Sequence, residues 1–364
     1  MRDSAILPIF AEERARTQSR PGRENLLGLN REVSMKAIGK AALAVLALAV
    51  AFTSGCEGRH SSKEVFYLIA TNLKLPYWQT AVAGFNKAAG QYKVTARVEG
   101  PDTYDAQAEL AALHSAIAVK PAGILISVAD ASLLQPEIDA AINAGIPVIT
   151  FDSDAVGSRR LYFIGTNNLE AGRLGGKRII EKLGGKGNVV FFTLGDQPNI
   201  DERLKGFKEV FTTRPDIHIT AVVDTKGDAR KAFDWTEESM ALTGSQRIDA
   251  FVCLESASGK LVADAVKRGG GGGREVLAFD VNQDTLDGIK SGGIDATIAQ
   301  KPFTMAYVGL RALDQIYHDP PKDLARDYSA DSFAPYPVFV DTGTSLVDQS
   351  NVDLYIAGAA EGTK

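Results

Sequence analysis

Two rhythms of apolar and polar residues alternate along the chain from about residue 63 onward. Short runs rich in β-branched and aromatic residues, such as residues 65–71, are followed by stretches with apolar residues at helical spacing, such as residues 106–119. The short runs predict buried strands, and the helical spacing predicts amphipathic helices. Because strand and helix follow one another steadily, the pattern predicts parallel sheets covered by helices on both faces.

This alternation runs through the chain twice. The first round predicts helices over residues 78–90, 106–119 and 133–144, and strands over residues 65–71, 93–99, 123–128, 147–151 and 161–165. The second round predicts helices over residues 169–183, 202–212, 229–242 and 259–267, and strands over residues 188–194, 217–223, 250–254, 276–279 and 296–299. Because about 300 residues exceed one ordinary core, we predict an α/β protein of two doubly wound, Rossmann-like lobes with a cleft between them.

The lobes are expected to be joined by a hinge of several strands. We expect lobe one to comprise residues 63–166 and 301–330, with a helix over residues 304–317. Lobe two is expected to comprise residues 167–300 and 337–364, although the periodicity after Asp341 is weak. The chain would then cross between the lobes near residues 165–168, 300–302 and 332–338.

Residues 35–55 differ in composition from this body. They begin with Met35 and carry two lysines, then an apolar run over residues 41–52, and they end in small residues before Cys56. This order is typical of a secretory signal that is cleaved before a lipid-modified cysteine, so we expect a lipoprotein anchored through Cys56. Plain export and a membrane-spanning anchor are the alternatives, since Thr53 stands where such signals usually carry Leu. The apolar run is shorter than the roughly 20 residues of a membrane span.

Residues 1–34 fit no such scheme. They are rich in Arg and Glu and have no sustained apolar period. We expect translation to start at Met35, which would make residues 1–34 a non-native or disordered extension.

Charge, cysteine and histidine content exclude several classes of protein. After removal of the eight basic and five acidic residues before Cys56, 32 basic and 40 acidic residues remain, and a net charge of −8 does not favour nucleic-acid binding. The other cysteine, Cys253, lies in an apolar run over residues 248–254 that predicts a buried strand, so it is expected to behave as a small hydrophobe. The four histidines are scattered along the sequence, so we expect neither a metal site nor a cofactor.

Polar residues follow nearly every predicted strand. In parallel sheets the carboxyl ends of the strands form the binding edge, so these residues are candidates for a site in the cleft. Single members could instead cap the next helix, as Asp, Asn and Ser often do. The candidates are Asn72, Lys74, Asp102, Asp130, Asp152, Ser153, Asp154, Asp196, Asn199, Asp224, Asp228, Glu255, Ser256, Asp280, Asn282 and Gln300.

Five short stretches, taken in order, resemble the ribose-type periplasmic sugar-binding proteins of ABC importers, which have the type I fold. They are residues 71–78 (TNLKLPYW), 147–152 (PVITFD), 201–207 (DERLKGF), 277–280 (LAFD) and 297–302 (TIAQKP). The resemblance implies a sugar-like ligand, an ABC permease as partner, a monomer and no enzymatic activity.

The resemblance also implies roles for single residues. Tyr77 and Trp78 match an aromatic pair that sandwiches the sugar ring, whose C–H faces are apolar. Asp152 matches a carboxylate that accepts hydrogen bonds from hydroxyls, and Arg203 matches a donor to the ring oxygen. Asp280 and Gln300 match further polar contacts, and the strand ends add Asn72 and Asp228 to the ligand-binding candidates.

The departures from the ribose pattern bear on the ligand. This chain has Leu75 and Glu255 where ribose binders carry Asn, and Ser153 where they carry Arg. The cleft thereby loses donors and gains an acceptor, so we expect a ligand that is rich in hydroxyls or bears an amine rather than ribose. Glu255 could instead pair with Lys260 or lie outside the contact shell.

We therefore expect an extracytoplasmic, membrane-anchored substrate-binding component of an ABC transporter that closes about its hinge on a monosaccharide, polyol or related molecule. The alternative is a sensory lipoprotein that presents a small signal to a membrane receptor. Glycoside hydrolysis would use two carboxylates, but all the acids have binding roles in the resemblance. A transcriptional regulator would need a helix-turn-helix ahead of the lobes, and residues 1–34 lack its apolar period.

Overall fold

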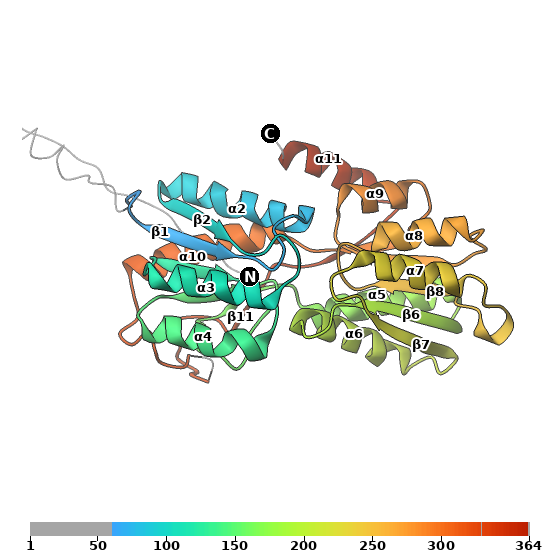
Figure 1. Ribbon diagram of the computed structural model, residues 1–364, viewed down its shortest axis with the longest axis horizontal. Coiled ribbons are helices and arrows are strands. Elements are labelled where there is room, and N and C mark those ends of the chain that lie inside the picture. Colours follow the sequence, from blue (N-terminus) through green and yellow to red (C-terminus); the bar gives the residue numbers. More distant parts are fainter. Residues whose placement is uncertain (1–59, 329, 363–364) are drawn as a thin grey trace, which may run out of the picture. The chain divides into compact units, whose positions relative to one another are not determined.

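The computed structural model describes residues 60–328 and 330–362 (Figure 1). The expected N-terminal extension, the signal segment and the lipid site Cys56 lie outside the described residues. Within residues 60–328 and 330–362, none of the helices has the length and apolarity that crossing a membrane requires.

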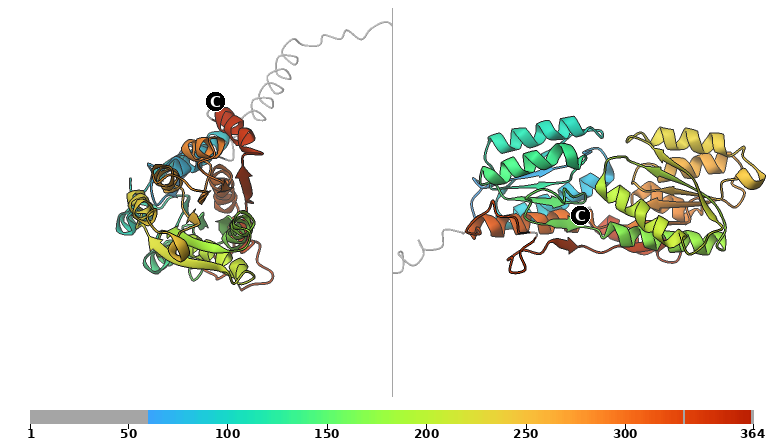
Figure 2. Two further views of the ribbon diagram at one scale, coloured as in Figure 1. Left: turned by 90° about the vertical axis from the view of Figure 1, so that its right-hand side faces the viewer. Right: turned by 90° about the horizontal axis from the view of Figure 1, so that it is seen from below.

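Lobe one is built on a six-stranded sheet in which every neighbouring pair is parallel, with the order β11-β5-β4-β3-β1-β2. Its strands are β1 (Val65–Ile69), β2 (Thr95–Glu99), β3 (Gly123–Ile126), β4 (Val148–Phe151), β5 (Phe163–Gly165) and β11 (Phe339–Asp341). Its helices are α2 (Pro76–Tyr92), α3 (Ala106–Ala118), α4 (Ala131–Asn143) and α10 (Pro302–His318). Helices α2 and α10 pack together on one face, and α3 and α4 on the other (Figure 2).

Lobe two repeats this plan with the order β12-β10-β9-β8-β6-β7, in which only β12 is antiparallel to its neighbour. Its strands are β6 (Gly187–Thr193), β7 (Ile217–Asp224), β8 (Ala250–Cys253), β9 (Glu275–Phe279), β10 (Ala296–Ala299) and β12 (Ser345–Asp348). Its helices are α5 (Asn168–Leu183), α6 (Pro198–Phe211), α7 (Ala229–Ser239), η1 (Gly244–Gln246, a 3₁₀ turn), α8 (Gly259–Arg268), α9 (Gln283–Lys290) and α11 (Val352–Gly362). The predicted class, two doubly wound α/β lobes, is confirmed.

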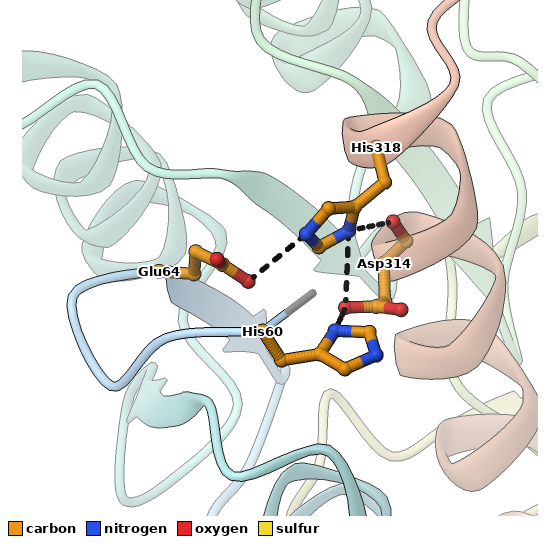
Figure 3. A group of neighbouring side chains, drawn as sticks. All are labelled: His60, Glu64, Asp314 and His318. Atoms are coloured by element: carbon orange, nitrogen blue, oxygen red, sulfur yellow. Dashed lines mark hydrogen bonds and ion pairs between the residues drawn. The ribbon is translucent and has the colours of Figure 1, made fainter. Parts of the chain in front are cut away.

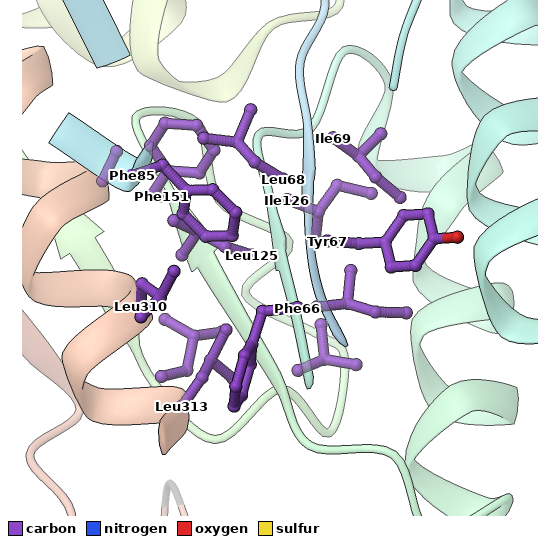
Figure 4. Packing of buried hydrophobic residues seen from close by; sticks show 14 of the residues in the cluster. Phe66, Tyr67, Leu68, Ile69, Phe85, Leu125, Ile126, Phe151, Leu310 and Leu313 are labelled. Atoms are coloured by element: carbon purple, nitrogen blue, oxygen red, sulfur yellow. The ribbon is translucent and has the colours of Figure 1, made fainter. Parts of the chain in front are cut away.

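Each sheet is buried on both faces. In lobe one, Phe66 and Leu125 from the sheet meet Leu310 and Leu313 from α10 in one apolar core (Figure 4). In lobe two, the neighbours Phe191 and Phe192 of β6 belong to different cores, one on each face of the sheet. Successive side chains of a strand point to opposite faces, so both must be apolar when helices cover both. This explains why the strands read as continuous apolar runs.

Three connections join the lobes, and they are hydrogen-bonded to one another. They follow β5, β10 and β11. Thr166 after β5 donates from its hydroxyl to Gln300 Oε1 after β10, at 2.9 Å, and the Thr344 hydroxyl after β11 donates to the carbonyl of Ala299, at 2.8 Å. Short, mutually bonded connections are the elements about which two lobes can hinge.

The third connection differs from the expectation. β11 pairs with β5 in the sheet of lobe one, so the chain crosses after Asp341 and not within residues 332–338. The expected tail of lobe two from residue 337 therefore begins too early. The apolar pattern could not reveal this, because β11 is three residues long and half-exposed at a sheet edge.

Candidate functional site

A cavity of about 80 Å³ lies where the carboxyl ends of the two sheets meet. Both lobes contribute to its lining. Among the residues that line it are eight of the ten predicted ligand-binding residues: Asn72, Tyr77, Trp78, Asp152, Arg203, Glu255, Asp280 and Gln300. The carboxyl ends of the strands thus bring together side chains that are more than 200 positions apart in the sequence, as expected for parallel sheets.

Asp152 accepts more side-chain hydrogen bonds than the other acidic groups that line the cavity. It follows β4 with a left-handed backbone, φ 62°, which Asp tolerates better than most residues. Its carboxylate accepts hydrogen bonds from the Tyr77 hydroxyl at 2.5 Å and the Ser127 hydroxyl at 3.0 Å, and from the Asn199 amide of lobe two at 3.4 Å. Burial raises the pKa of Asp152, and the Tyr77 hydrogen bond, the Arg203 charge and the Ser127 hydrogen bond oppose that rise.

Tyr77 and Trp78 do not form the expected sandwich. Their ring centroids are 5.1 Å apart and their planes meet at 84°, edge to face. They are consecutive residues at the start of α2, and consecutive helical side chains point about 100° apart. One sugar ring cannot lie flat between them. Tyr77 binds Asp152 through its hydroxyl, which leaves Trp78, itself only 5% exposed, as an apolar wall.

Arg203 is held deep in lobe two by close packing of α5 against α6. An added Cβ at Gly172 would lie 2.0 Å from the Arg203 carbonyl oxygen, so only glycine allows the helices to approach this closely. The guanidinium donates from Nε to Asn168 at 2.9 Å and from Nη1 to the Leu254 carbonyl at 2.7 Å. Its centre lies 4.5 Å from the centroid of the Phe279 ring. Within the described chain its Nη2 makes no hydrogen bond, so this donor is available to a ligand.

Asp280 follows β9 and, like Asp152, has a left-handed backbone, with φ 70°. Its one side-chain hydrogen bond within the described chain comes from Gln300 Nε2, at 2.9 Å. Its pKa is raised to about 7: burial is the main cause, Arg203 and Gln300 oppose the rise, and the nearby carboxylates of Asp152 and Glu255 add to it. Asp280 is therefore a buried acceptor that titrates near neutral pH.

Glu255 lies in the cavity wall with its carboxylate turned to its own backbone. Its oxygens accept hydrogen bonds from the N–H groups of Ala257, at 2.5 Å, and Ser258, at 3.0 Å. Burial raises its pKa, and these hydrogen bonds oppose the rise. The alternative pairing with Lys260 is not seen, because Lys260 is bound to Asp264 one helical turn away.

Two predicted residues do not reach the cavity. Ser153 is buried beside Asp152, and its hydroxyl has no hydrogen-bond partner in the described chain. Asp228 caps α7 by accepting from the Arg230 N–H at 3.0 Å, although its neighbour Gly227 lines the cavity. Asp130 likewise caps α4, accepting from the Ser132 N–H at 2.8 Å. Capping thus accounts for two of the strand-end carboxylates.

The cavity is also lined by polar and aromatic residues outside the ten predicted ligand-binding residues. Tyr104, Gln197, Asn199 and Ser256 line it. Asn199 and Ser256 stand among the strand-end residues, but no single motif separates them from the helix caps. Tyr104 follows β2, so the same rule could have found it if aromatic residues had been included.

A larger cavity, about 770 Å³, lies in lobe two near Arg178, Lys182 and Asp295. It sits at the amino ends of β9 and β10, where Glu275 and Asp295 lie. Parallel sheets bind ligands at the opposite end of their strands. We therefore take the smaller cavity between the lobes as the functional site.

Comparison with known proteins shows relatives along both lobes. The family model described as periplasmic binding protein domain matches residues 66–318. The ribose import binding protein RbsB of Haemophilus influenzae is 26% identical over 280 residues, which cover 75% of this chain and 92% of that protein. A solved sugar-binding protein of a sugar ABC transporter from Bacillus halodurans is 34% identical with a TM-score of 0.71, covering 80% of this chain and all of the other. AraP, an arabinose binding protein from Geobacillus stearothermophilus, is 32% identical with a TM-score of 0.67, covering 80% and 99%.

Proposed function

Because this chain belongs to the periplasmic binding protein domain family, we propose that it is the extracytoplasmic substrate-binding component of an ABC importer. We propose a monosaccharide, polyol or related polyhydroxylated molecule as its ligand, held in the cavity between the lobes. The resemblance to sugar-binding proteins of importers, stated above from five short motifs, is confirmed by this match and by the relatives. Proteins of this family bind and deliver substrates and are not enzymes.

One observation carries the proposal: both lobes place buried hydrogen-bonding side chains on one small cavity. Asp152, Arg203, Asp280 and Gln300 are all between 2% and 6% exposed. Burying such groups is unfavourable unless they find partners. A ligand that presents several hydroxyls can give hydrogen atoms to the carboxylates and accept them from the guanidinium and amide.

The positions of these side chains suggest which contacts each lobe would make to the ligand. Hydroxyl groups would donate to Asp152 from one side and to Asp280 from the other, and Arg203 Nη2 would donate to a ring or hydroxyl oxygen. Hydrogen bonds to ionised groups are roughly twice as strong as neutral ones. Trp78 would cover an apolar C–H face of the ligand. An analogue that lacks one of these hydroxyls would leave a buried charge unpaired, which is the basis of selectivity.

Hinge closure follows from this division. A ligand that contacts both lobes binds the closed arrangement more tightly than the open one, and so shifts the population toward it. The membrane permease would recognise the closed form. Proteins of this family work outside the cytoplasm; attachment through a lipid on Cys56 and a monomeric state complete the proposal.

The test is a thermal-shift and calorimetric screen of the purified protein against monosaccharides, polyols and amino sugars. A ligand that binds only the folded state raises the melting temperature, and at a hundredfold excess over Kd the stabilisation is about 2.7 kcal/mol. Asp228→Asn is the control variant for this screen and should respond to the same ligands as the parent protein. Asn also caps helices, and residue 228 lies outside the cavity. If no compound of these classes raised the melting temperature, the proposal would be wrong.

A further inference from the structure

Two of the four histidines come together at the far end of lobe one. His60 and His318 lie beside Glu64 and Asp314, and one ligand atom from each of the four residues falls within 4.8 Å of all the others (Figure 3). The expectation that the histidines are scattered is therefore wrong for this pair. His60 and Glu64 come from the segment that enters β1, whereas Asp314 and His318 are one turn apart on α10.

The hydrogen bond made by His318 decides which of its nitrogens is free. Nδ1 lies 2.9 Å from the backbone carbonyl of Asp314, and a carbonyl only accepts, so Nδ1 carries the proton. In the neutral ring the other nitrogen, Nε2, then has a lone pair, and it lies 3.5 Å from Glu64 Oε2. Metal-bound histidines show this arrangement, in which the second ring nitrogen is fixed by a backbone carbonyl or carboxylate.

Glu64 provides independent evidence for a missing partner. Its Oε2 is buried and has no hydrogen-bond partner within the described chain. It therefore faces the lone pair of neutral His318 with a lone pair of its own, which is repulsive unless a proton or a metal ion lies between them. Across the cluster, Asp314 Oδ1 lies 3.0 Å from His60 Nδ1.

The charge and spacing of the cluster suit one divalent transition metal ion. Two carboxylates balance two positive charges, and two neutral imidazoles add nitrogen donors, which Ca²⁺ and Mg²⁺ do not favour. In a tetrahedral zinc site with bonds of about 2.0–2.1 Å, donor atoms lie roughly 3.3 Å apart. Two of the six donor–donor separations, 3.0 Å and 3.5 Å, are close to that value, and all six are within 4.8 Å. We propose that His60, Glu64, Asp314 and His318 bind one Zn²⁺ ion.

This site would act on the structure and not on the sugar. Glu64 precedes the first residue of β1, whereas Thr71 and Asn72 at the other end of that strand line the cavity. At about 3.3 Å per residue the two sites are roughly 20 Å apart. The ion would clamp the segment that enters β1 onto the last turn of α10. Metal binding that requires the folded arrangement contributes directly to stability.

The test uses the full-length protein, stripped with a chelator and then supplied with Zn²⁺, Ca²⁺ or Mg²⁺. We expect one bound zinc per chain by elemental analysis and a melting temperature raised by roughly 5 °C at a hundredfold excess of free zinc over Kd. His318→Gln and His60→Gln should each weaken zinc binding at least about 100-fold. The matched control is His114→Gln, because His114 also contacts a carboxylate, Glu137 at 2.9 Å, but belongs to no cluster.

A second readout does not depend on melting. The exposed Lys63 lies between the proposed ligands His60 and Glu64, so bound zinc should slow tryptic cleavage after it several-fold in the parent protein and not in His60→Gln. Sugar binding should be unchanged by zinc or by either variant. The proposal is overturned if zinc neither binds one per chain nor protects Lys63. It is also overturned if His114→Gln lowers zinc affinity as much as His318→Gln, or if Ca²⁺ or Mg²⁺ has the same effect as Zn²⁺.

Discussion

In each sheet an aspartate directly follows the strand that lies third from the edge strand β11 or β12, and the two aspartates have very different surroundings. β4 and β9 hold equivalent places in their sheets, and Asp152 and Asp280 follow them with nearly the same left-handed backbone. Asp152 accepts hydrogen bonds from three side chains. Asp280 accepts from Gln300 alone within the described chain, and its pKa is about 7.

The comparison shows that one fold position can hold two kinds of carboxylate. The protein itself fixes Asp152 in place and supplies donors that favour its ionised form. Asp280 is left with unused acceptor capacity, so a ligand hydroxyl has the most to offer it. We infer that Asp152 orients the ligand, whereas Asp280 gains most from the ligand's arrival.

The largest expected effect comes from removing the pre-oriented member. Asp152→Ala removes a buried carboxyl acceptor from the cavity, and hydrogen bonds to its ionised form contribute about 1.5–3 kcal/mol each. With two such bonds lost, the Kd should rise by roughly 100-fold or more in titration calorimetry. Unfolding should stay cooperative. A variant that bound normally would place the ligand elsewhere.

The second effect separates the two aspartates by pH. If a ligand hydroxyl donates to ionised Asp280, a protonated Asp280 must release its proton before the ligand can bind. Affinity for the ligand therefore falls as pH drops below about 7. We expect binding about tenfold weaker at pH 6 than at pH 8, and Asp280→Asn should remove most of this dependence. The same slope in Asp280→Asn would assign the titration to another group.

Stability without ligand should show the opposite trend. The pKa of Asp280 is raised from 3.8 to about 7 in the folded protein, so between these values the folded state holds a proton that the unfolded state has lost. The free energy of unfolding attributable to Asp280 therefore decreases as pH rises from about 4 to about 7, by at most about 4 kcal/mol. Denaturant titrations of the parent protein and Asp280→Asn at pH 5 and pH 8 measure this difference. If the free energy of unfolding changed equally between pH 5 and pH 8 in the two proteins, the pKa of Asp280 would not be raised.

The sequence was sufficient to place both aspartates, since each directly follows an apolar run that could only be a buried strand. It could not distinguish them, because the partner that orients Asp152 is Tyr77, 75 positions earlier, and the hydroxyl contact depends on how α2 packs. The same limit explains the aromatic pair, whose edge-to-face angle is set by helix geometry. It also explains His60 and His318, which meet only because α10 returns to lobe one. Edge strand β11 is too short and too exposed to leave a pattern.

The third effect on binding comes from a variant in which Asp152 has fewer hydrogen-bond donors and so resembles Asp280. Tyr77→Phe removes the shortest donor while keeping the ring, and the pKa of Asp152 should rise because that hydrogen bond lowers it. We expect roughly tenfold weaker binding at neutral pH, from the loss of about 1.5 kcal/mol, and a steeper loss of affinity on acidification than in the parent protein. Unchanged pH dependence would show that Tyr77 does not control the protonation of Asp152.

The smallest expected effect concerns the contact that crosses between the lobes. Asn199 of lobe two donates to Asp152 of lobe one at 3.4 Å, near the upper limit for a hydrogen bond, so the contact is weak. Asn199→Ala should raise the Kd only two- to fivefold, with most of the change in the dissociation rate, because opening of the lobes would break this contact. Stopped-flow measurements on this variant and on Tyr77→Phe, whose contact lies within one lobe, test the distinction. A slower association rate in Asn199→Ala with an unchanged dissociation rate would contradict this. The Asn199 amide would then act while the ligand enters, and the hydrogen bonds from lobe one alone would hold Asp152 in the bound state.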